Sequence, residues 1–549
     1  MAAMDDRDEA AVIERLVSLR TRTSGTPGAA LAVTTRHGVV HRVTSGFANV
    51  DARIPVESGT LFQFGSIGKA FTAVMVLQLE HEGCLKVSAP VTDYLPWFAA
   101  NSPRPITLGD LLTHSAGLIG GSDASADVRS EVFQLRRLPP GLPPGTRFQY
   151  SNIGYKTLGL VLEEVTGQPY GQLVRSRILA PLHMHDAAGS ITHALRPALA
   201  VGYVPLFDDR PYRRGEPLVA APWIETDGGD GCLSAHADDL AAFARMLLNQ
   251  GAGPHGPILC PAHFDALTAP RVTVDATTAY GYGLFRVEPP RDGRLLLHHS
   301  GGMLGYHAGL AADVGGQLAA VVLANGPLDA EALAQEVVGT LVAAHNGCSH
   351  VWAAAQGTET DTRMGDPGLV GTYRAMESDP PGDVEVRAGE GGLELWQAGE
   401  WLGPMERVER DTYLVGHPAW DRFPLGFRRV GAVAAELWHG GRWFATPAYA
   451  GPRQFAPAPG GGAVVGHYRA HNPWVSNFRV VARQGKLTLV WPDGAEWQLL
   501  PLGSPEDFTF RGHDSHGPLA EVVQFRTALE GHMLEAHLSD QAYHRFFTP

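Results

Sequence analysis

The feature that most constrains the fold is an internal repeat in the C-terminal part of the 549-residue chain. The segment Leu369–Ala375 (LVGTYRA) recurs as Val464–Ala470 (VVGHYRA), and Arg442–Pro447 (RWFATP) recurs as Arg545–Pro549 (RFFTP). The offset between the copies stays between 95 and 103 residues, which indicates a duplicated unit. Each copy consists of short segments of alternating apolar and polar residues, a pattern typical of a small antiparallel β-barrel. The two expected barrels cover residues 365–455 and 460–549.

The N-terminal part, residues 1–350, has a different character. Residues 29–45 predict a pair of strands, and the stretch 80–200 is mostly helical with proline and glycine between the helices. Further strands precede a closing helix at 328–346. We therefore expect an α/β domain whose antiparallel sheet is flanked by helices, with a helical lobe inserted between the two ends of the sheet. A linker at 351–364 would join it to the barrels, which makes the protein multidomain.

The candidate chemistry begins at Ser66-Ile-Gly-Lys69, where a predicted strand runs into a helix. A serine hydroxyl is a weak nucleophile that needs a base within hydrogen-bond reach. Residues three apart on a helix share one face, so Lys69 can point at Ser66. The chain has only four lysines, and this Ser-x-x-Lys occurs once. The competing interpretation is a helix-capping serine followed by a solvated lysine.

Two further motifs support a catalytic interpretation. Tyr150-Ser-Asn152 is the only Tyr-x-Asn of the chain, and a phenol beside a lysine can relay a proton while an amide holds lysine and substrate. His299-Ser-Gly301-Gly302 follows an apolar strand, and its glycines allow a substrate to approach the backbone closely. Tyr150 could equally be an ordinary buried tyrosine, and His-x-Gly alone has little specificity.

The order and spacing of these motifs resemble the serine β-lactamase and penicillin-binding-protein superfamily, and more narrowly its class C-related branch. The resemblance covers about residues 5–346 and includes LLTHSAGL at 111–118 and Tyr280-Gly-Tyr-Gly. It implies Ser66 as nucleophile, Lys69 as base and an oxyanion hole formed by backbone N–H groups. The implied site residues are Ser66, Lys69 and Tyr150 for catalysis, and Asn152, His299, Gly301 and Gly302 for substrate binding. His-Ser-Gly replaces the Lys-Thr-Gly of typical β-lactamases, which weighs against β-lactamase activity.

Followed by two lipocalin-like barrels, such a domain looks like the bacterial D-aminopeptidases. The resemblance implies a serine hydrolase that acts through an acyl-enzyme, first as a D-stereospecific aminopeptidase, amidase or esterase. An acyltransferase or a cyclase of nonribosomal peptides, a β-lactamase, and a non-enzymatic ligand sensor remain alternatives. In D-aminopeptidases a barrel loop reaches the catalytic cleft, and here the candidate is the polar loop 511–518. We expect Asp514 to pair there with the α-ammonium of a substrate.

Charge and composition exclude several partners. The formal net charge of −14 leaves no basic surplus for nucleic acid, and no apolar run is long enough to span a membrane. The N-terminus lacks the pattern of a secretory signal, so we expect a cytoplasmic location. The scattered cysteines and histidines predict no metal, and no cofactor is expected. The expected partner is a small molecule or short peptide, and a homodimer stays open. The cysteines are Cys84, Cys232, Cys260 and Cys348.

Overall fold

The structure is a computed structural model. It describes residues 6–123, 127–287, 294–345, 366–376, 382–458, 460–539 and 541–546. The expected linker at 351–364 and Cys348 lie outside these ranges. The chain forms two compact units, one of Met1–Val204 with Leu218–Gly357 and one of Pro205–Pro217 with Thr358–Pro549. In the described ranges, each helix is too short or too polar to cross a membrane.

The first unit is built on a nine-stranded antiparallel sheet in the order β10-β11-β12-β13-β14-β15-β1-β2-β3. β1 joins the two ends of the unit, because it pairs on one side with β2 and on the other with β15, where Leu31 lies opposite Val322. The strands are β1 (Gly28–Thr35), β2 (Val39–Asn49), β3 (Ile54–Pro55), β10 (Val272–Thr273), β11 (Thr278–Tyr280), β12 (Phe285–Val287), β13 (Leu296–Met303), β14 (Tyr306–Asp313) and β15 (Leu318–Ala324). The expected antiparallel α/β sheet is confirmed.

Helices cover both faces of this sheet. Leu31 and Val33 of β1 pack into a buried apolar cluster with α1 (Asp6–Ser24) and α9 (Ala330–His345). On the opposite face, α7 (Ala237–Leu248) packs against β1, β14 and β15. Because both faces are covered, β1 is apolar along most of its length and almost wholly buried.

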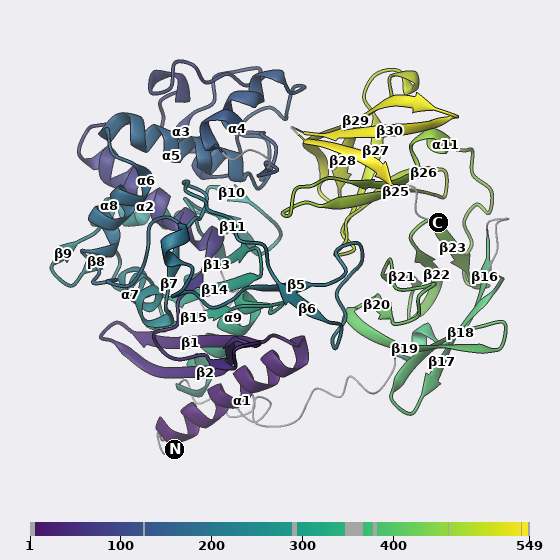
Figure 1. Ribbon diagram of the computed structural model, residues 1–549, viewed down its shortest axis with the longest axis horizontal. Helices are drawn as coiled ribbons and strands as arrows, with labels where there is room; N and C mark the ends of the chain where they lie inside the picture. The colour runs from purple at the N-terminus through teal and green to yellow at the C-terminus, as the bar shows by residue number, and fades with distance from the viewer. Residues whose placement is uncertain are drawn as a thin grey trace. The chain divides into compact units, whose positions relative to one another are not determined.

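A helical lobe is inserted between the N-terminal and C-terminal strands, as expected. In Figure 1, α3, α4 and α5 gather at the end of this unit that lies away from α1. The lobe and its neighbours are α2 (Gly68–His81), α3 (Leu108–Leu112), α4 (Val128–Gln134), α5 (Asn152–Thr166), α6 (Tyr170–Val174) and α8 (Pro261–Thr268). Three small sheets pair β4 (Phe62–Gln63) with β7 (Ser234–Ala235), β5 (Tyr203–Pro205) with β6 (Leu218–Ala220), and β8 (Ala252–Gly253) with β9 (Gly256–Pro257).

The second unit contains two closed antiparallel barrels of eight strands each, which confirms the interpretation of the repeat. The repeated segments 369–375 and 464–470 stand at the start of the two barrels, and each contains the same hydrogen bond. Tyr373 donates its hydroxyl to the Leu369 carbonyl at 2.6 Å, and Tyr468 donates its hydroxyl to the Val464 carbonyl at 2.9 Å. The strands are β16 (Gly371–Ala375), β17 (Val384–Gly389), β18 (Gly392–Gln397), β19 (Glu400–Glu409), β20 (Thr412–Val415), β21 (Leu425–Val430), β22 (Val433–His439) and β23 (Arg442–Ala445), then β24 (Gly466–Arg469), β25 (Asn477–Arg483), β26 (Lys486–Val490), β27 (Glu496–Pro501), β28 (Thr509–Asp514), β29 (Gly517–Leu529), β30 (His532–Leu538) and β31 (Gln541–Phe546).

One element of the second unit comes from the middle of the sequence. The segment Pro205–Pro217 leaves the first part of the chain and packs with the barrels. Its Arg210 forms an ion pair with Asp421 of the first barrel, and its Asp209 accepts a hydrogen bond from Arg479 of the second barrel at 3.0 Å. The segment therefore bonds to both barrels, which sequence analysis did not anticipate.

Candidate active site

Ser66 and Lys69 lie together where the sheet meets the helical lobe. Ser66 sits in the short 3-10 turn Gly65–Ile67 that leads into α2, and Lys69 occupies the first turn of that helix. Nζ of Lys69 lies 2.9 Å from Oγ of Ser66 and donates a second hydrogen bond to the Asp230 carbonyl at 2.7 Å. The Lys69 side chain is completely buried. The solvated-lysine interpretation is therefore excluded, and the predicted nucleophile and base are in contact.

Glycines let strand β13 run directly against this turn. Gly65 has a φ of +51°, and a Cβ there would lie 2.6 Å from the Gly302 carbonyl oxygen and 2.8 Å from the Gly302 nitrogen. A Cβ on Gly301 would lie only 1.9 Å from the Phe64 carbonyl oxygen. Gly302 itself faces open space, since a Cβ on it would meet no atom within 4 Å. The backbone of Gly302 thus borders a space next to the nucleophile, which suits an oxyanion hole.

Tyr150 is brought to Lys69 as the sequence predicted. Nζ of Lys69 lies 4.8 Å from the centroid of the Tyr150 ring and 5.7 Å from that of Tyr155. Tyr155 is fully buried and donates its hydroxyl to the Leu112 carbonyl at 2.7 Å. Burial raises the pKa of Tyr155 well above its usual value, so this phenol keeps its proton. Tyr150 is only partly buried and is the phenol with access to a bound substrate.

His299 lies in the same cluster, but it is arranged differently from a substrate-binding side chain. It is 1 % exposed, with Nδ1 2.6 Å from the Ser300 carbonyl and Nε2 3.1 Å from the Tyr280 hydroxyl. Burial, with a contribution from the charge of Lys69, lowers the pKa of His299 to about 3. The ring is therefore neutral, with Nδ1 donating and Nε2 accepting. Because both nitrogens are engaged, His299 positions Tyr280 and strand β13, and direct binding of substrate through this ring is disfavoured.

Asn152 is the first residue of α5, whose preceding Ser151 accepts a capping hydrogen bond from the Gly154 N–H at 3.1 Å. The backbone N–H of Asn152 donates to the Gly120 carbonyl at 2.7 Å, which fixes the start of the helix. Its side-chain Oδ1 is buried and has no hydrogen-bond partner among the described residues. A buried acceptor without a donor is costly, so Oδ1 is suited to accept a hydrogen bond from a substrate.

The polar loop expected at 511–518 is not a loop. Strand β28 continues to Asp514 and β29 begins at Gly517, so only Ser515 and His516 form the turn. Oδ1 of Asp514 accepts a hydrogen bond from the backbone N–H of His516 at 2.7 Å, an arrangement that stabilises tight turns. Strand pairing therefore extends further than the polar composition suggested. Asp514 belongs to the second unit, and its role in amine recognition stays a prediction.

Three further residues, which were not among the site residues predicted from the sequence, hold the site together. His114 packs against Tyr150 with ring centroids 4.3 Å apart, and its Nδ1 accepts a hydrogen bond from the Ser151 N–H at 3.0 Å. Burial, followed by the charge of Lys69, lowers the pKa of His114 well below its usual value, so it is neutral. Tyr280 bonds His299, and Asp230 supplies the carbonyl that Lys69 contacts. The sequence motifs LLTHSAGL and Tyr280-Gly-Tyr-Gly contain His114 and Tyr280, but the contacts that these two residues make with the site form only in the folded chain.

The fold and the site define a serine hydrolase: a buried lysine contacts a serine at a helix start, beside a glycine-lined strand of an antiparallel sheet. Comparison with known proteins agrees, because the family model described as Beta-lactamase matches residues 12–343. The chain therefore belongs to the beta-lactamase family, whose members here include penicillin-binding-protein homologues and esterases.

Two curated relatives have different described roles. The chain is 32% identical over 334 residues to "Penicillin-binding protein 4" of Amycolatopsis lactamdurans. This alignment covers 57% of this chain and 84% of that protein. It is also 32% identical over 250 residues to "Esterase EstB" of Burkholderia gladioli, covering 41% of this chain and 60% of the esterase.

Two solved structures share the fold at 21% sequence identity. The octameric penicillin-binding protein homologue from Pyrococcus abyssi aligns with a TM-score of 0.58 over 79% of this chain and 99% of its own. EstCE1, described as a hydrolase with promiscuous acyltransferase activity, aligns with a TM-score of 0.52 over 61% of this chain and 98% of its own.

Proposed function

We propose that the protein hydrolyses amides or esters of small amino-acid derivatives or short peptides through an acyl-enzyme on Ser66, most specifically as a D-stereospecific aminopeptidase or amidase. The observation that carries the covalent mechanism is the 2.9 Å contact between Nζ of the fully buried Lys69 and Oγ of the partly buried Ser66. A base in such contact can take the hydroxyl proton as the oxygen attacks a carbonyl.

The surrounding groups fit the remaining steps. Nζ of Lys69 already donates to the Asp230 carbonyl, which holds the amine in place so that its lone pair can face Ser66 when it is neutral. In the proposed reaction, the backbone N–H groups of Ser66 and Gly302 stabilise the oxyanion. Lys69 then returns the proton to the leaving group, with Tyr150 as relay, and a water molecule releases the acyl group by the same route.

The neutral state of His299 favours this function over β-lactam hydrolysis. A β-lactam antibiotic presents a carboxylate, which a cationic lysine would bind in the typical Lys-Thr-Gly strand. Here the corresponding His299 has a pKa of about 3 and both ring nitrogens engaged. It therefore offers no positive charge to such a carboxylate near neutral pH, and we expect poor β-lactamase activity.

The two barrels support the aminopeptidase subtype through their layout, and Asp514 is the proposed partner for a substrate α-ammonium. Their packed interiors weigh against ligand sensing as the main role. The barrel from β16 to β23 encloses the buried side chains of Tyr373, Trp420 and Phe427, and the barrel from β24 to β31 encloses those of Tyr468 and Phe478. The interior of an eight-stranded barrel is just wide enough to be filled by side chains, so these barrels leave little room for a ligand.

Acyl transfer is a second candidate, favoured by the open space next to Gly302 and by the described activity of EstCE1. An acceptor other than water could enter through this space and attack the acyl-enzyme. The two candidates share Ser66 and differ only in the second nucleophile. Adding an alcohol or amine acceptor to the assay separates them, because a transferase gives the new ester or amide while a hydrolase gives the free acid.

The test has two stages. A fluorophosphonate that reacts with activated serines is incubated with the protein, and intact-protein mass spectrometry should show one adduct that Ser66→Ala abolishes. A panel of D- and L-aminoacyl amides, esters and peptidyl thioesters then identifies the substrate class. We expect the free-amine D-substrates to turn over fastest. An adduct that persists in Ser66→Ala contradicts the nucleophile, and preference for L- or N-acylated substrates contradicts the aminopeptidase subtype.

A further inference from the structure

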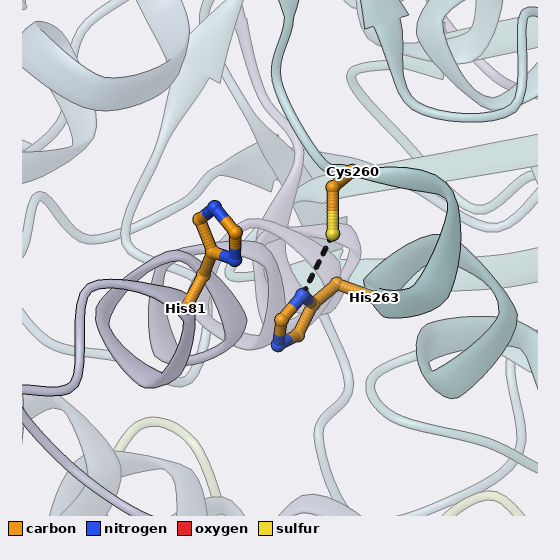
Figure 2. A group of neighbouring side chains, drawn as sticks. All are labelled: His81, Cys260 and His263. Atoms are coloured by element: carbon orange, nitrogen blue, oxygen red, sulfur yellow. Dashed lines mark hydrogen bonds between the residues drawn. The ribbon is translucent and has the colours of Figure 1, made fainter.

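Three side chains with metal-binding atoms converge at the end of α2 that lies away from Ser66. Figure 2 shows His81, the last residue of α2, facing Cys260 and His263 at the start of α8. One ligand atom from each residue lies within 4.8 Å of the other two, and Sγ of Cys260 is 2.9 Å from Nδ1 of His263. Among the described residues, this is the one group of three or more such side chains that is close enough to hold a metal ion.

The distances suit a tetrahedral ion of the zinc class. Zinc binds a thiolate at about 2.3 Å and an imidazole nitrogen at about 2.05 Å, so tetrahedral ligands lie about 3.4–3.6 Å apart. The present separations, from 2.9 Å to at most 4.8 Å, bracket these values, so adjustments of side-chain rotamers are sufficient. A thiolate with two imidazoles selects zinc, copper or cobalt over magnesium or calcium, which prefer oxygen ligands.

The surroundings of His263 place a carboxylate near its far ring nitrogen, where histidine ligands usually have an acceptor. With Nδ1 directed at Cys260, Nε2 faces Oε2 of Glu80 at 3.8 Å. The other oxygen of Glu80 accepts a hydrogen bond from the backbone N–H of Val87 at 2.8 Å, which holds the carboxylate in place. A carboxylate on the far nitrogen fixes the orientation of a metal-binding imidazole and increases its basicity.

Cys260 is also placed to act as a ligand. It is the N-cap residue of α8, and its side chain makes no capping hydrogen bond to the helix. Its Sγ points instead to the imidazole of His263. A cavity of about 420 Å³, lined by the three ligands together with Gln78 and Arg177, leaves room for a fourth ligand such as water.

From these observations we propose that His81, Cys260 and His263 bind one transition-metal ion of the zinc class. Its position is separate from the catalytic site, because the 14 residues of α2 between the Ser66 turn and His81 span about 21 Å. The ion would join the C-terminal end of α2, the helix that starts at the nucleophile, to the N-terminal end of α8. It is a stabilising clamp. No sequence motif indicates this site, since Cys260-x-x-His263 lacks a nearby second pair and His81 is far away in the chain.

The test uses the full-length protein after treatment with a chelator under reducing conditions. Cobalt is titrated first, because a cobalt–thiolate bond gives a charge-transfer absorption in the near ultraviolet, and zinc is then measured by competition with a chromophoric chelator. We expect one equivalent of cobalt, displacement of cobalt by zinc, and a higher melting temperature with zinc. Cys260→Ser, which places a good N-cap residue on α8, should abolish the charge-transfer absorption, and His81→Ala should weaken zinc binding at least tenfold.

Two matched variants serve as controls. Cys84→Ser removes another free thiol, three residues after His81, and His255→Ala removes the partner of His183, whose Nε2 lies 2.8 Å from that of His255. Both should bind zinc like the wild type. If Cys84→Ser or His255→Ala abolishes binding while Cys260→Ser retains it, the site is elsewhere. If the wild type gives no charge-transfer absorption and no zinc binding at micromolar concentration, the proposal is wrong.

Discussion

Two neighbouring glycines of strand β13 offer a sharp test of the proposed oxyanion hole, because an added methyl group should reduce kcat at Gly301 and leave it nearly unchanged at Gly302. In Gly301→Ala the new Cβ would lie 1.9 Å from the Phe64 carbonyl oxygen, whereas Cβ atoms in proteins essentially never come closer than 3.0 Å to such an atom. In Gly302→Ala the new Cβ meets no atom within 4 Å. Both variants keep the backbone N–H groups.

The expected loss of kcat in Gly301→Ala follows from the distance between the added Cβ and the Phe64 carbonyl oxygen. To relieve the clash in Gly301→Ala, β13 and the segment before Ser66 must separate by at least the difference between 3.0 Å and 1.9 Å, which is 1.1 Å. A misplacement of about 1 Å at a reacting centre costs about 10²-fold in rate, and loss of one oxyanion donor costs about 10²–10³-fold. We therefore expect kcat of Gly301→Ala to fall at least about 10²-fold, or about 2.7 kcal/mol of transition-state stabilisation. Overpacking should also cost about 1–3 kcal/mol in the free energy of unfolding.

The assay is hydrolysis of a p-nitrophenyl ester, with kcat and KM measured for the wild type and both variants and thermal melting as the check on folding. Gly302→Ala should melt like the wild type and keep kcat within a few-fold, although KM can change because its methyl group enters the open space. If Gly301→Ala keeps more than a tenth of the wild-type kcat, the strand does not position an oxyanion donor. Equal loss in both folded variants would likewise refute the reasoning.

Three further predictions test other groups. Lys69→Arg should lose about 10²–10⁴-fold in kcat, since a guanidinium cannot act as a base. A kcat similar to that of the wild type would show that another base operates. For His299, the folded pKa of about 3 lies below the unfolded value of about 6.5, so stability falls by about 1.4 kcal/mol per pH unit from pH 6.5 down to about 3. Denaturant melts of His299→Gln should show a correspondingly smaller acid dependence, and an unchanged slope would contradict the buried neutral state. Asp514→Asn should raise KM for free-amine substrates and spare neutral esters, whereas Asp493→Asn, which removes a similar turn carboxylate, should change neither.

The sequence predicted best those features that depend on residues close together in the chain or on a repeated pattern. Ser66 and Lys69 are three residues apart, so helix geometry alone predicts their contact. The repeat predicts two equivalent barrels, and the matching bonds of Tyr373 and Tyr468 show that the copies are equivalent in structure as well. The strands at 29–45 correspond to β1, a continuous apolar run that is buried, and to β2, whose residues alternate in exposure along most of the strand.

What the sequence could not predict depends on contacts between distant segments. His114 becomes part of the site only because the loop before α5 folds over it, and Gln149 donates its backbone N–H to the His114 carbonyl at 2.7 Å. His299 is buried with both ring nitrogens hydrogen-bonded, which the sequence does not reveal, and its role in substrate binding stays a prediction. Polar composition misled at 511–518, because a tight turn needs only two residues and the flanking polar side chains can stay in strands.

The two buried lysines of the first unit show how environment, rather than residue type, assigns a role. Lys156 forms ion pairs with Asp123 and, at 2.6 Å, with Glu131. Burial lowers the pKa of Lys156, but the neighbouring carboxylates, that of Asp230 first among them, raise it overall, so this lysine is held as a cation. Lys69 instead contacts a hydroxyl, a carbonyl and the faces of two tyrosine rings. These direct contacts are with neutral groups, one of which is the hydroxyl of the proposed nucleophile, whereas the direct contacts of Lys156 are with carboxylates. The proposed base and the structural cation thus differ only in what the fold places around them.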